Sequence, residues 1–187
     1  VLAVSGRDGI FWYDKKIMSD TTLTSTRPFV LYGETVVGEG AHLTLSAGTT
    51  LMFHPNATMR VDGSLVAQGT RSERVTFRGD RTDRMFVNLY YDNTPMRWGG
   101  VTLTSKSRDN VLTWADIPSA TFGLVADSCD VRLDSCAIHN IGGNALTLNA
   151  ATCNAYNTQL SNALGHCLDV TGGRTMLTYC TLAPFYP

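Results

Sequence analysis

The chain has 187 residues, a net charge of −1, 43% hydrophobic residues and 17% charged residues. This composition is typical of a folded domain, and the lack of a basic surplus argues against a nucleic-acid-binding surface. The sequence contains no apolar stretch of about 18 residues, so we expect no membrane-spanning helix.

Residues 1–22 lie before the repeat that organises the rest of the sequence. The segment GIFWYDKKI at residues 9–17 is apolar enough to form a strand. We interpret residues 1–22 as an extended linker and residues 23–187 as the main domain. Because the sequence does not begin with Met, we expect it to be a piece of a longer chain.

In the N-terminal half, apolar residues recur with a period of about 22 residues, which is typical of stacked repeats. The pairs at this spacing are Leu43 and Leu65, Leu45 and Ala67, and Phe53 and Val75. The pattern has one interruption, because Met59 and Val61 find their equivalents only at Val101 and Leu103, nearly two repeats later. We therefore predict an insertion loop near residues 78–98.

The C-terminal half has the most regular repeat. Three sets of residues follow one another at the same spacing: Leu124, Leu146 and Leu168; Leu133, Ala155 and Leu177; and Ile138, Leu160 and Leu182. One coil earlier, Leu103, Leu112 and Ile117 precede the first members of these sets by slightly less than a full repeat. Each repeat has three apolar pairs at positions i and i+2, separated by turn formers such as Gly142 and Gly143, which predicts three short strands.

These patterns predict an all-β fold, a right-handed single-stranded parallel β-helix with about 22-residue coils and three short strands per coil. About six coils fit residues 23–187, and we expect the stack to continue beyond residue 187. Each strand would pair with its copy one coil along, about 4.8 Å away. Leucine-rich repeats fit less well, because their fixed Leu-x-x-Leu-x-Leu spacing is absent.

The repeat also gives expectations for cysteine and asparagine. No two of the five cysteines fall at the same position of adjacent coils. Cys136 and Cys180 share a position but lie two coils apart, which is too far for a disulfide. We predict free thiols, mostly buried. Asn140 and Asn162 share a turn position, which predicts a ladder of hydrogen-bonded Asn side chains.

The sequence resembles the secreted right-handed β-helix repeat proteins of the Bacteroidota, which share a pectate-lyase-like fold. The segments that carry the resemblance are LTLSAGTTLMFHPNATMRVDGSLVAQGT, VTFRGDR and WGGVTL. Many proteins of this group look like outer-membrane lipoproteins. The resemblance implies a place in the cell envelope, at the outer-membrane surface or secreted, with a lipid anchor at a missing N-terminus as one option. It also offers a second interpretation of residues 1–22, as the last strand of a preceding β-sandwich.

The insertion provides the candidate binding residues. Loops that leave a rigid scaffold often carry binding residues, and aromatic side chains beside charged groups suit a carbohydrate or a protein partner. The candidates are Arg81, Arg84, Phe86, Tyr90, Tyr91, Asp92, Arg97 and Trp98. The alternative is a loop that folds back and covers the flank of the coils. Acidic residues of the loop are potential Ca²⁺ ligands, but no fixed spacing supports this, so we expect no metal and no cofactor.

Catalytic motifs of the enzymes that share this fold are incomplete. Compared with pectin hydrolases, YNTQL has Gln159 in place of an Asp. The segment GHC at residues 165–167 matches their Gly-His-Gly motif only in part. His139 and His166 have no carboxylate partner in the pattern, so we assign no catalytic residue.

These observations favour a non-catalytic cell-envelope scaffold or binding module. It would present the insertion and a lateral surface to an outer-membrane or surface protein complex, or to a polysaccharide. The alternative is a polysaccharide lyase or glycoside hydrolase whose active residues lie partly outside this sequence. This alternative rests on analogy of fold alone.

Overall fold

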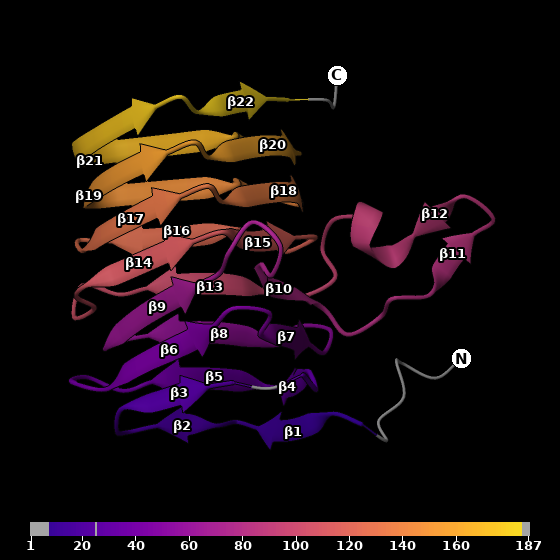
Figure 1. Cartoon of the computed structure of the whole chain (residues 1–187). Helices are drawn as coiled ribbons and strands as arrows, with labels where there is room; N and C mark the ends of the chain where they lie inside the picture. Colours follow the sequence, from indigo (N-terminus) through magenta and orange to yellow (C-terminus); the bar gives the residue numbers. More distant parts are fainter. Residues whose placement is uncertain (1–7, 25, 185–187) are drawn as a thin grey trace.

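The structure is a computed structural model that describes residues 8–24 and 26–184. Its strands stack in three parallel columns to form a β-solenoid, and each complete coil contributes one strand to each column (Figure 1). The predicted all-β parallel β-helix is confirmed, with coils of about 22 residues, but the stack has about eight coils rather than six. The expected continuation beyond residue 187 lies outside the described residues.

Column 1 runs the whole length of the stack. It consists of β1 (Ile10–Tyr13), β4 (Phe29–Tyr32), β7 (Thr50–Phe53), β10 (Val75–Gly79), β15 (Ala115–Pro118), β18 (Ala137–Ile141), β20 (Gln159–Ala163) and β22 (Thr181–Ala183). All of its neighbouring pairs are parallel.

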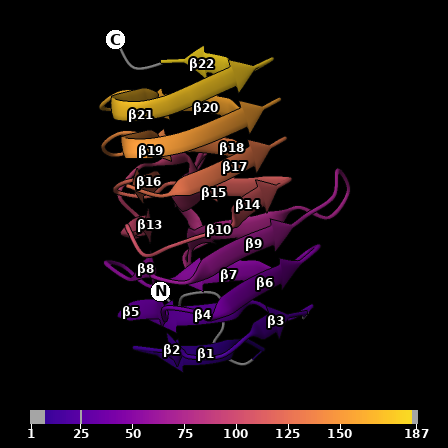
Figure 2. The same ribbon diagram turned by 90° about the vertical axis from the view of Figure 1, so that its left-hand side faces the viewer.

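Columns 2 and 3 form one continuous sheet. Column 2 consists of β2 (Lys16–Ile17), β5 (Glu34–Val37), β8 (Thr58–Val61), β13 (Gly100–Leu103) and β16 (Leu124–Asp127). Column 3 consists of β3 (Thr21–Leu23), β6 (His42–Ser46), β9 (Ser64–Gln68), β14 (Asn110–Thr113) and β17 (Asp130–Asp134). The long strands β19 (Leu146–Tyr156) and β21 (Leu168–Thr178) extend both columns (Figure 2).

Strand register confirms the repeat in the C-terminal half. Leu124 pairs with Leu146, and Leu146 pairs with Leu168. The sets that begin at Leu133 and Ile138 align in the same way. Because side chains alternate across a strand, these in-register pairs place apolar side chains above one another in the core.

Two pairings predicted from the sequence are wrong in register. Val101, not Leu103, pairs with Leu124. A shift of two positions keeps the same face of the strand inward, so the apolar pattern does not detect it. Phe53 pairs with Gly79, not Val75, because the turn at residues 69–74 is longer than the turn at residues 47–49 in the preceding coil.

The stack also begins earlier than residue 23. Strand β1 pairs in parallel with β4, β2 with β5, and β3 with β6, so residues 10–23 form a coil of the same solenoid. Ile10 pairs with Phe29, a spacing shorter than the regular repeat, and a search at the regular period therefore misses this coil. Residues 1–7 of the expected linker lie outside the described part.

Inward side chains of the three columns fill a narrow core. Leu31, Phe53 and Phe77 of column 1 are completely buried, as are Leu43 and Leu65 of column 3. Each such side chain contributes roughly 1.5–3 kcal/mol by leaving water. Packing between adjacent coils therefore holds the solenoid together.

The predicted Asn ladder is confirmed. The Nδ2 of Asn162 donates a hydrogen bond to the Oδ1 of Asn140, one coil away. Both residues have positive φ, 55° and 58°. Asn adopts this left-handed conformation more readily than most residues, so the same residue type suits both the turn and the ladder.

The predicted insertion lies between β10 and β13. Met59 pairs with Val101 and Val61 pairs with Leu103, which confirms the predicted equivalence across the insertion. The inserted chain forms a hairpin of β11 (Arg84–Phe86) and β12 (Leu89–Tyr90), followed by the 3-10 turn η1 (Tyr91–Asn93). Figure 1 shows the hairpin projecting from the side of the stack. Within the described ranges, no helix is long and apolar enough to cross a membrane.

The cysteines are free, as predicted. Cys129, Cys136 and Cys153 are buried, whereas Cys167 and Cys180 are half-buried. Burial raises the pKa of Cys129 and Cys136 to about 11 and the pKa of Cys153 to about 12. These three thiols therefore stay protonated, and so weakly nucleophilic, at neutral and mildly alkaline pH.

We expect iodoacetamide at pH 8 to modify Cys167 and Cys180 in the folded protein and to spare the three buried thiols until the protein is unfolded. Peptide mass spectrometry before and after denaturation measures the difference. Similar labelling of all five cysteines in the native protein would contradict the register of the core.

Candidate binding site at the insertion

The insertion is anchored to the coils through Asp92 of the 3-10 turn η1. Its carboxylate forms an ion pair with Arg78 of β10. Its carbonyl oxygen accepts hydrogen bonds from the Ser119 hydroxyl and from the Asn140 Nδ2, the latter at 3.2 Å. Three separate coils thus hold one residue of the insertion, so its base has a fixed position.

Trp98 closes the insertion and belongs to the core. Its indole stacks on Phe53 with ring centres 4.2 Å apart, and its Nε1 donates to the Pro118 carbonyl oxygen at 2.8 Å. Only 1% of Trp98 is exposed. Its interpretation as a binding residue is corrected, because a ligand would not reach it without disrupting the fold.

The neck of the hairpin is formed by Arg81, Asp83 and Tyr91. Arg81 donates to both carboxylate oxygens of Asp83, at 3.1 and 2.6 Å, and its guanidinium lies 3.7 Å from the ring centre of Tyr91. The Tyr91 backbone N–H donates to the Asp83 carbonyl oxygen at 3.2 Å. The hydrogen bond from Arg81 lowers the pKa of Asp83. The charge of Arg81 is therefore already paired within the neck.

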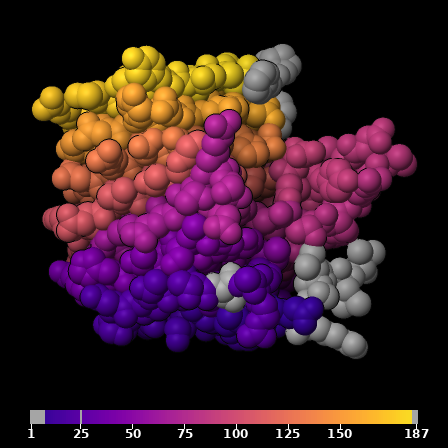
Figure 3. Space-filling view, in the orientation of Figure 1, coloured from indigo at the N-terminus to yellow at the C-terminus, as the bar shows by residue number. Residues whose placement is uncertain are grey.

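The tip of the hairpin, residues 84–90, is largely exposed, with Met85 and Leu89 half-buried. Phe86 is 70% exposed and Val87 is 79% exposed. Arg84 donates to the Tyr90 hydroxyl at 2.9 Å and lies 5.0 Å from the centre of its ring. Figure 3 shows the insertion as a lobe that stands out from the coils. The predicted residues Arg84, Phe86 and Tyr90 are therefore accessible, and the tip does not fold back over the flank.

A hollow of about 130 Å³ lies at the foot of the neck. It is lined by Pro55, Gly79, Asp80, Arg81, Tyr91, Met96 and Arg97. Arg97 donates through Nε to the Pro95 carbonyl oxygen at 2.9 Å, and its guanidinium lies 5.5 Å from the Tyr91 ring centre. A Cβ at Gly79 would lie 3.0 Å from the Arg97 Cβ, so glycine permits the close approach of these two strands.

Asp80, which lines the hollow, pairs with His54, which does not line it, and the sequence analysis missed this pair. The Oδ2 of Asp80 lies 2.7 Å from the Nδ1 of His54. Asp80 is 3% exposed, and its Oδ1 has no hydrogen-bond partner in the described structure. The Tyr32 ring lies 4.5 Å from the His54 ring, and burial raises the pKa of Tyr32. A strictly regular repeat places Thr76, not Asp80, beside His54, which explains why the pair was missed.

The acidic residues of the insertion do not converge on one point. Asp80, Asp83 and Asp92 each bond to a different basic side chain. Among residues 8–24 and 26–184, no group of three or more His, Cys, Asp and Glu side chains could hold a metal ion.

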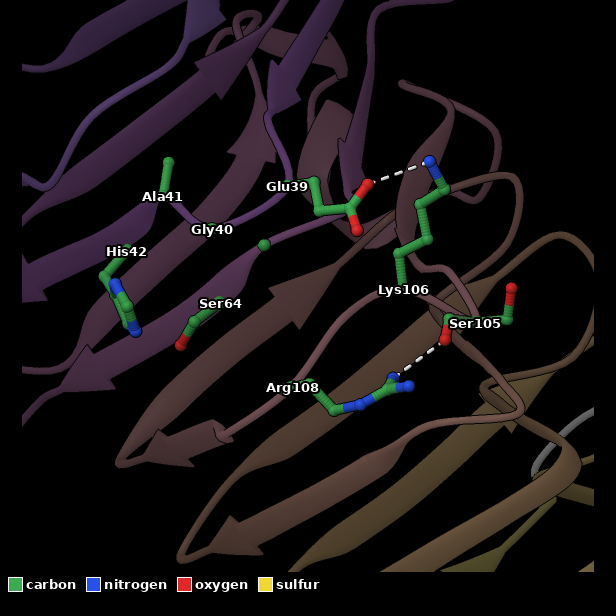
Figure 4. A pocket seen from close by; sticks show the side chains of 9 residues that line it. Glu39, Gly40, Ala41, His42, Ser64, Ser105, Lys106 and Arg108 are labelled. Carbon is green, nitrogen blue, oxygen red and sulfur yellow. Dashed lines mark hydrogen bonds and ion pairs between the residues drawn. The ribbon is translucent and has the colours of Figure 1, made fainter.

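A second hollow, of about 390 Å³, lies over the turns that connect column 2 to column 3 (Figure 4). Its charged groups have protein partners. Lys106 pairs with Glu39 at 2.9 Å, and Arg108 donates to the carbonyl oxygens of Ser105 and Ser107, both at 2.7 Å. We assign no function to this hollow, because these contacts satisfy its polar groups.

The other two histidines considered from the sequence lie away from the insertion hollow. His139 of β18 pairs with Pro118 of β15 in column 1, and burial lowers the pKa of His139. The backbone N–H of His166 donates to the Asn144 side chain at 2.9 Å. Neither contact indicates catalysis.

The candidate site thus has three parts: an anchored neck, an exposed apolar tip and a hollow with a buried carboxylate. A scan against protein-family models, a search of curated proteins and a search of solved structures found no match to this chain. Geometry, rather than membership of a family, is therefore the basis for assigning a function.

The ion pair between Asp92 and Arg78 is expected to contribute to the stability of the fold. The substitution Asp92→Asn removes the charge that pairs with Arg78, whose side chain is 25% exposed. We expect the free energy of unfolding to fall by about 1–3 kcal/mol, because a largely buried guanidinium loses its partner. Denaturant unfolding measures this change. The control Phe86→Ala, at the exposed tip, should change stability by less than about 0.5 kcal/mol. Equal midpoints for Asp92→Asn and wild type would contradict the anchoring role.

Proposed function

We propose that this protein is a non-catalytic scaffold of the cell envelope that presents the hairpin tip to a protein partner. The observation that carries this proposal is the pairing of an exposed apolar tip with an anchored base. Phe86 and Val87 are exposed, while Asp92 is held by three coils.

The chemistry of the tip suits a protein rather than a small ligand. Interfaces between proteins are centred on a few apolar or aromatic side chains that insert into a pocket of the partner. An exposed Phe beside an exposed Val at the end of a two-stranded hairpin has this character. Because the neck is already ordered, binding costs less conformational entropy than it would for a free loop.

The cell-envelope setting is supported by the sequence resemblance described above. An outer-membrane or surface protein complex is the kind of partner that this setting favours. Column 3 offers a separate lateral surface, where Arg132, Asn154 and Met176 line a shallow hollow of about 420 Å³. Such a flat, stacked surface is suited to a broad, weak contact.

Replacing residues 84–90 with Gly-Gly tests the role of the tip. The hydrogen bond between Tyr91 and Asp83 closes the neck, so a two-residue turn bridges it without disturbing Asp92. We expect partner binding to fall at least about tenfold while the melting temperature stays close to that of wild type.

Photo-crosslinking identifies the partner directly. With a photoreactive residue at position 87 in the native cells, we expect one discrete protein adduct, which Phe86→Ala should reduce. The control position is Thr22, an exposed residue of β3. Identical adducts from both positions, or no adduct from position 87, would count against a partner at the tip.

A further inference from the structure

We propose that two copies of this chain form a symmetric dimer in which the hairpin tip of each copy packs on an apolar patch of the other. The inference rests on the proposed role of the tip and names one partner for it, a second copy of the chain. The patch, called here the corner patch, consists of the exposed side chains of Met96, Phe122 and Leu164.

The corner patch is apolar and accessible across three coils. Met96 and Phe122 are each 55% exposed, and Leu164 is 50% exposed. The side chain of Met96 lies where a Cβ of Gly142 would stand, and a Cβ at Gly143 would lie 2.8 Å from the Phe122 Cδ1. The two glycines therefore let both side chains lie flat on the backbone of the next coil.

Leu164 extends the same surface by one more coil. Its backbone N–H donates to the Ile141 carbonyl oxygen at 2.9 Å, so Leu164 follows Gly142 in the stack. Three large apolar side chains thus meet around one pair of glycines. An exposed apolar cluster of this kind is typical of an interaction site, whereas scattered apolar residues are not.

The corner patch and the insertion lie on the same corner of the solenoid. The insertion connects β10 of column 1 to β13 of column 2. Phe122 and Leu164 lie in the equivalent connections of later coils, between β15 and β16 and between β20 and β21. Figure 1 shows the insertion projecting on the side to which the arrowheads of β18 and β20 point. Two copies that face each other with this corner can therefore each place a tip opposite the patch of the other.

The charges beside the two surfaces are complementary. At the tip, Arg84 bonds to the Tyr90 hydroxyl and to the Val87 carbonyl oxygen. Beside the patch, Asp169 accepts a hydrogen bond at 2.9 Å from Asn144, the residue that follows Gly143. Neither Arg84 nor Asp169 has an ion-pair partner among the residues that the structure describes. An unpaired cation thus flanks the apolar tip, and an unpaired anion flanks the apolar patch.

This complementarity favours a second copy over an unrelated protein. A two-fold axis makes the same contact twice, with Phe86 on the patch and Arg84 beside Asp169 in both directions. After the first tip is docked, the second contact forms within the complex, where its effective concentration is high. Two small contacts therefore hold the pair together more tightly than one.

Sedimentation velocity of the purified chain tests the dimer. We would vary the chain concentration from about 1 µM to about 1 mM, the range in which small interfaces associate. We expect a reversible dimer, and we expect a photoreactive residue at position 87 to crosslink to the peptide of a second chain that contains Phe122. A monomer throughout this range would overturn the proposal, as would a crosslink elsewhere on the second chain.

Variants of the tip and the patch locate the contact. Phe86→Ala and Phe122→Ala should each weaken the dimer at least about tenfold, because each removes an apolar anchor twice. The matched control is Met18→Ser, which replaces an apolar side chain of the first coil that is 70% exposed. It should leave the affinity unchanged. A dimer that resists both phenylalanine variants would overturn the assignment.

A charge exchange tests the pairing of Arg84 with Asp169 and keeps the test decisive if Phe122→Ala does not fold. Arg84→Asp and Asp169→Arg should each weaken the dimer at least about tenfold, because each places like charges together. Both changes in one chain should restore the affinity to within about threefold of wild type. No recovery in the double variant would overturn the pairing.

The two proposals fail in different ways. A purified chain that stays monomeric, together with an adduct between position 87 and a different protein in native cells, overturns the dimer and leaves the scaffold proposal standing. A dimer in solution whose only adduct from position 87 in native cells is a second copy supports the dimer and contradicts a partner of another kind.

Discussion

The in-register parallel pairing of each strand with its copy one coil away is the interaction on which the rest of this structure depends. It satisfies the backbone N–H and C=O groups that a narrow core would otherwise leave unpaired. Because the side-chain period of a strand is two, the same register places Leu124, Leu146 and Leu168 above one another. It also brings Asn140 and Asn162 within hydrogen-bonding distance. Neighbouring coils therefore determine one another, as in other repeat proteins.

This constraint explains why the solenoid tolerates a projecting insertion. Gly79 is fixed by its pairing with Phe53, and Gly100 is fixed by its pairing with Thr58. The chain between these two points is free to leave the stack because neither strand depends on it for register. The insertion therefore needs its own contacts with the coils, and the ion pair between Asp92 and Arg78 is one of them. Closing a loop of this length costs little more than closing a short one.

The sequence predicted the coils well wherever the turns have constant length. It failed where turns differ: the longer turn at residues 69–74 moves Phe53 from Val75 to Gly79, and that displacement also concealed the Asp80–His54 pair. Periodicity locates inward and outward positions, but it does not report how many residues a turn holds. Composition has a similar limit, since Trp98 in a polar segment was interpreted as exposed and is part of the core. Of the candidate residues, Arg84, Phe86 and Tyr90 lie exposed on the hairpin, and their role in binding stays a prediction.

Phe86 and Asp80 differ in what positions them. Phe86 is carried by an exposed hairpin whose anchor to the coils is Asp92, so the tip can adjust to the surface of a partner. Asp80 is the first residue after β10 and still follows the register of the stack, since its N–H donates to the Phe53 carbonyl oxygen. Its carboxylate is therefore positioned by the strand rather than by the loop. Movement of the tip on binding a protein would leave Asp80 in place, because the strand register and the contact with His54 hold it.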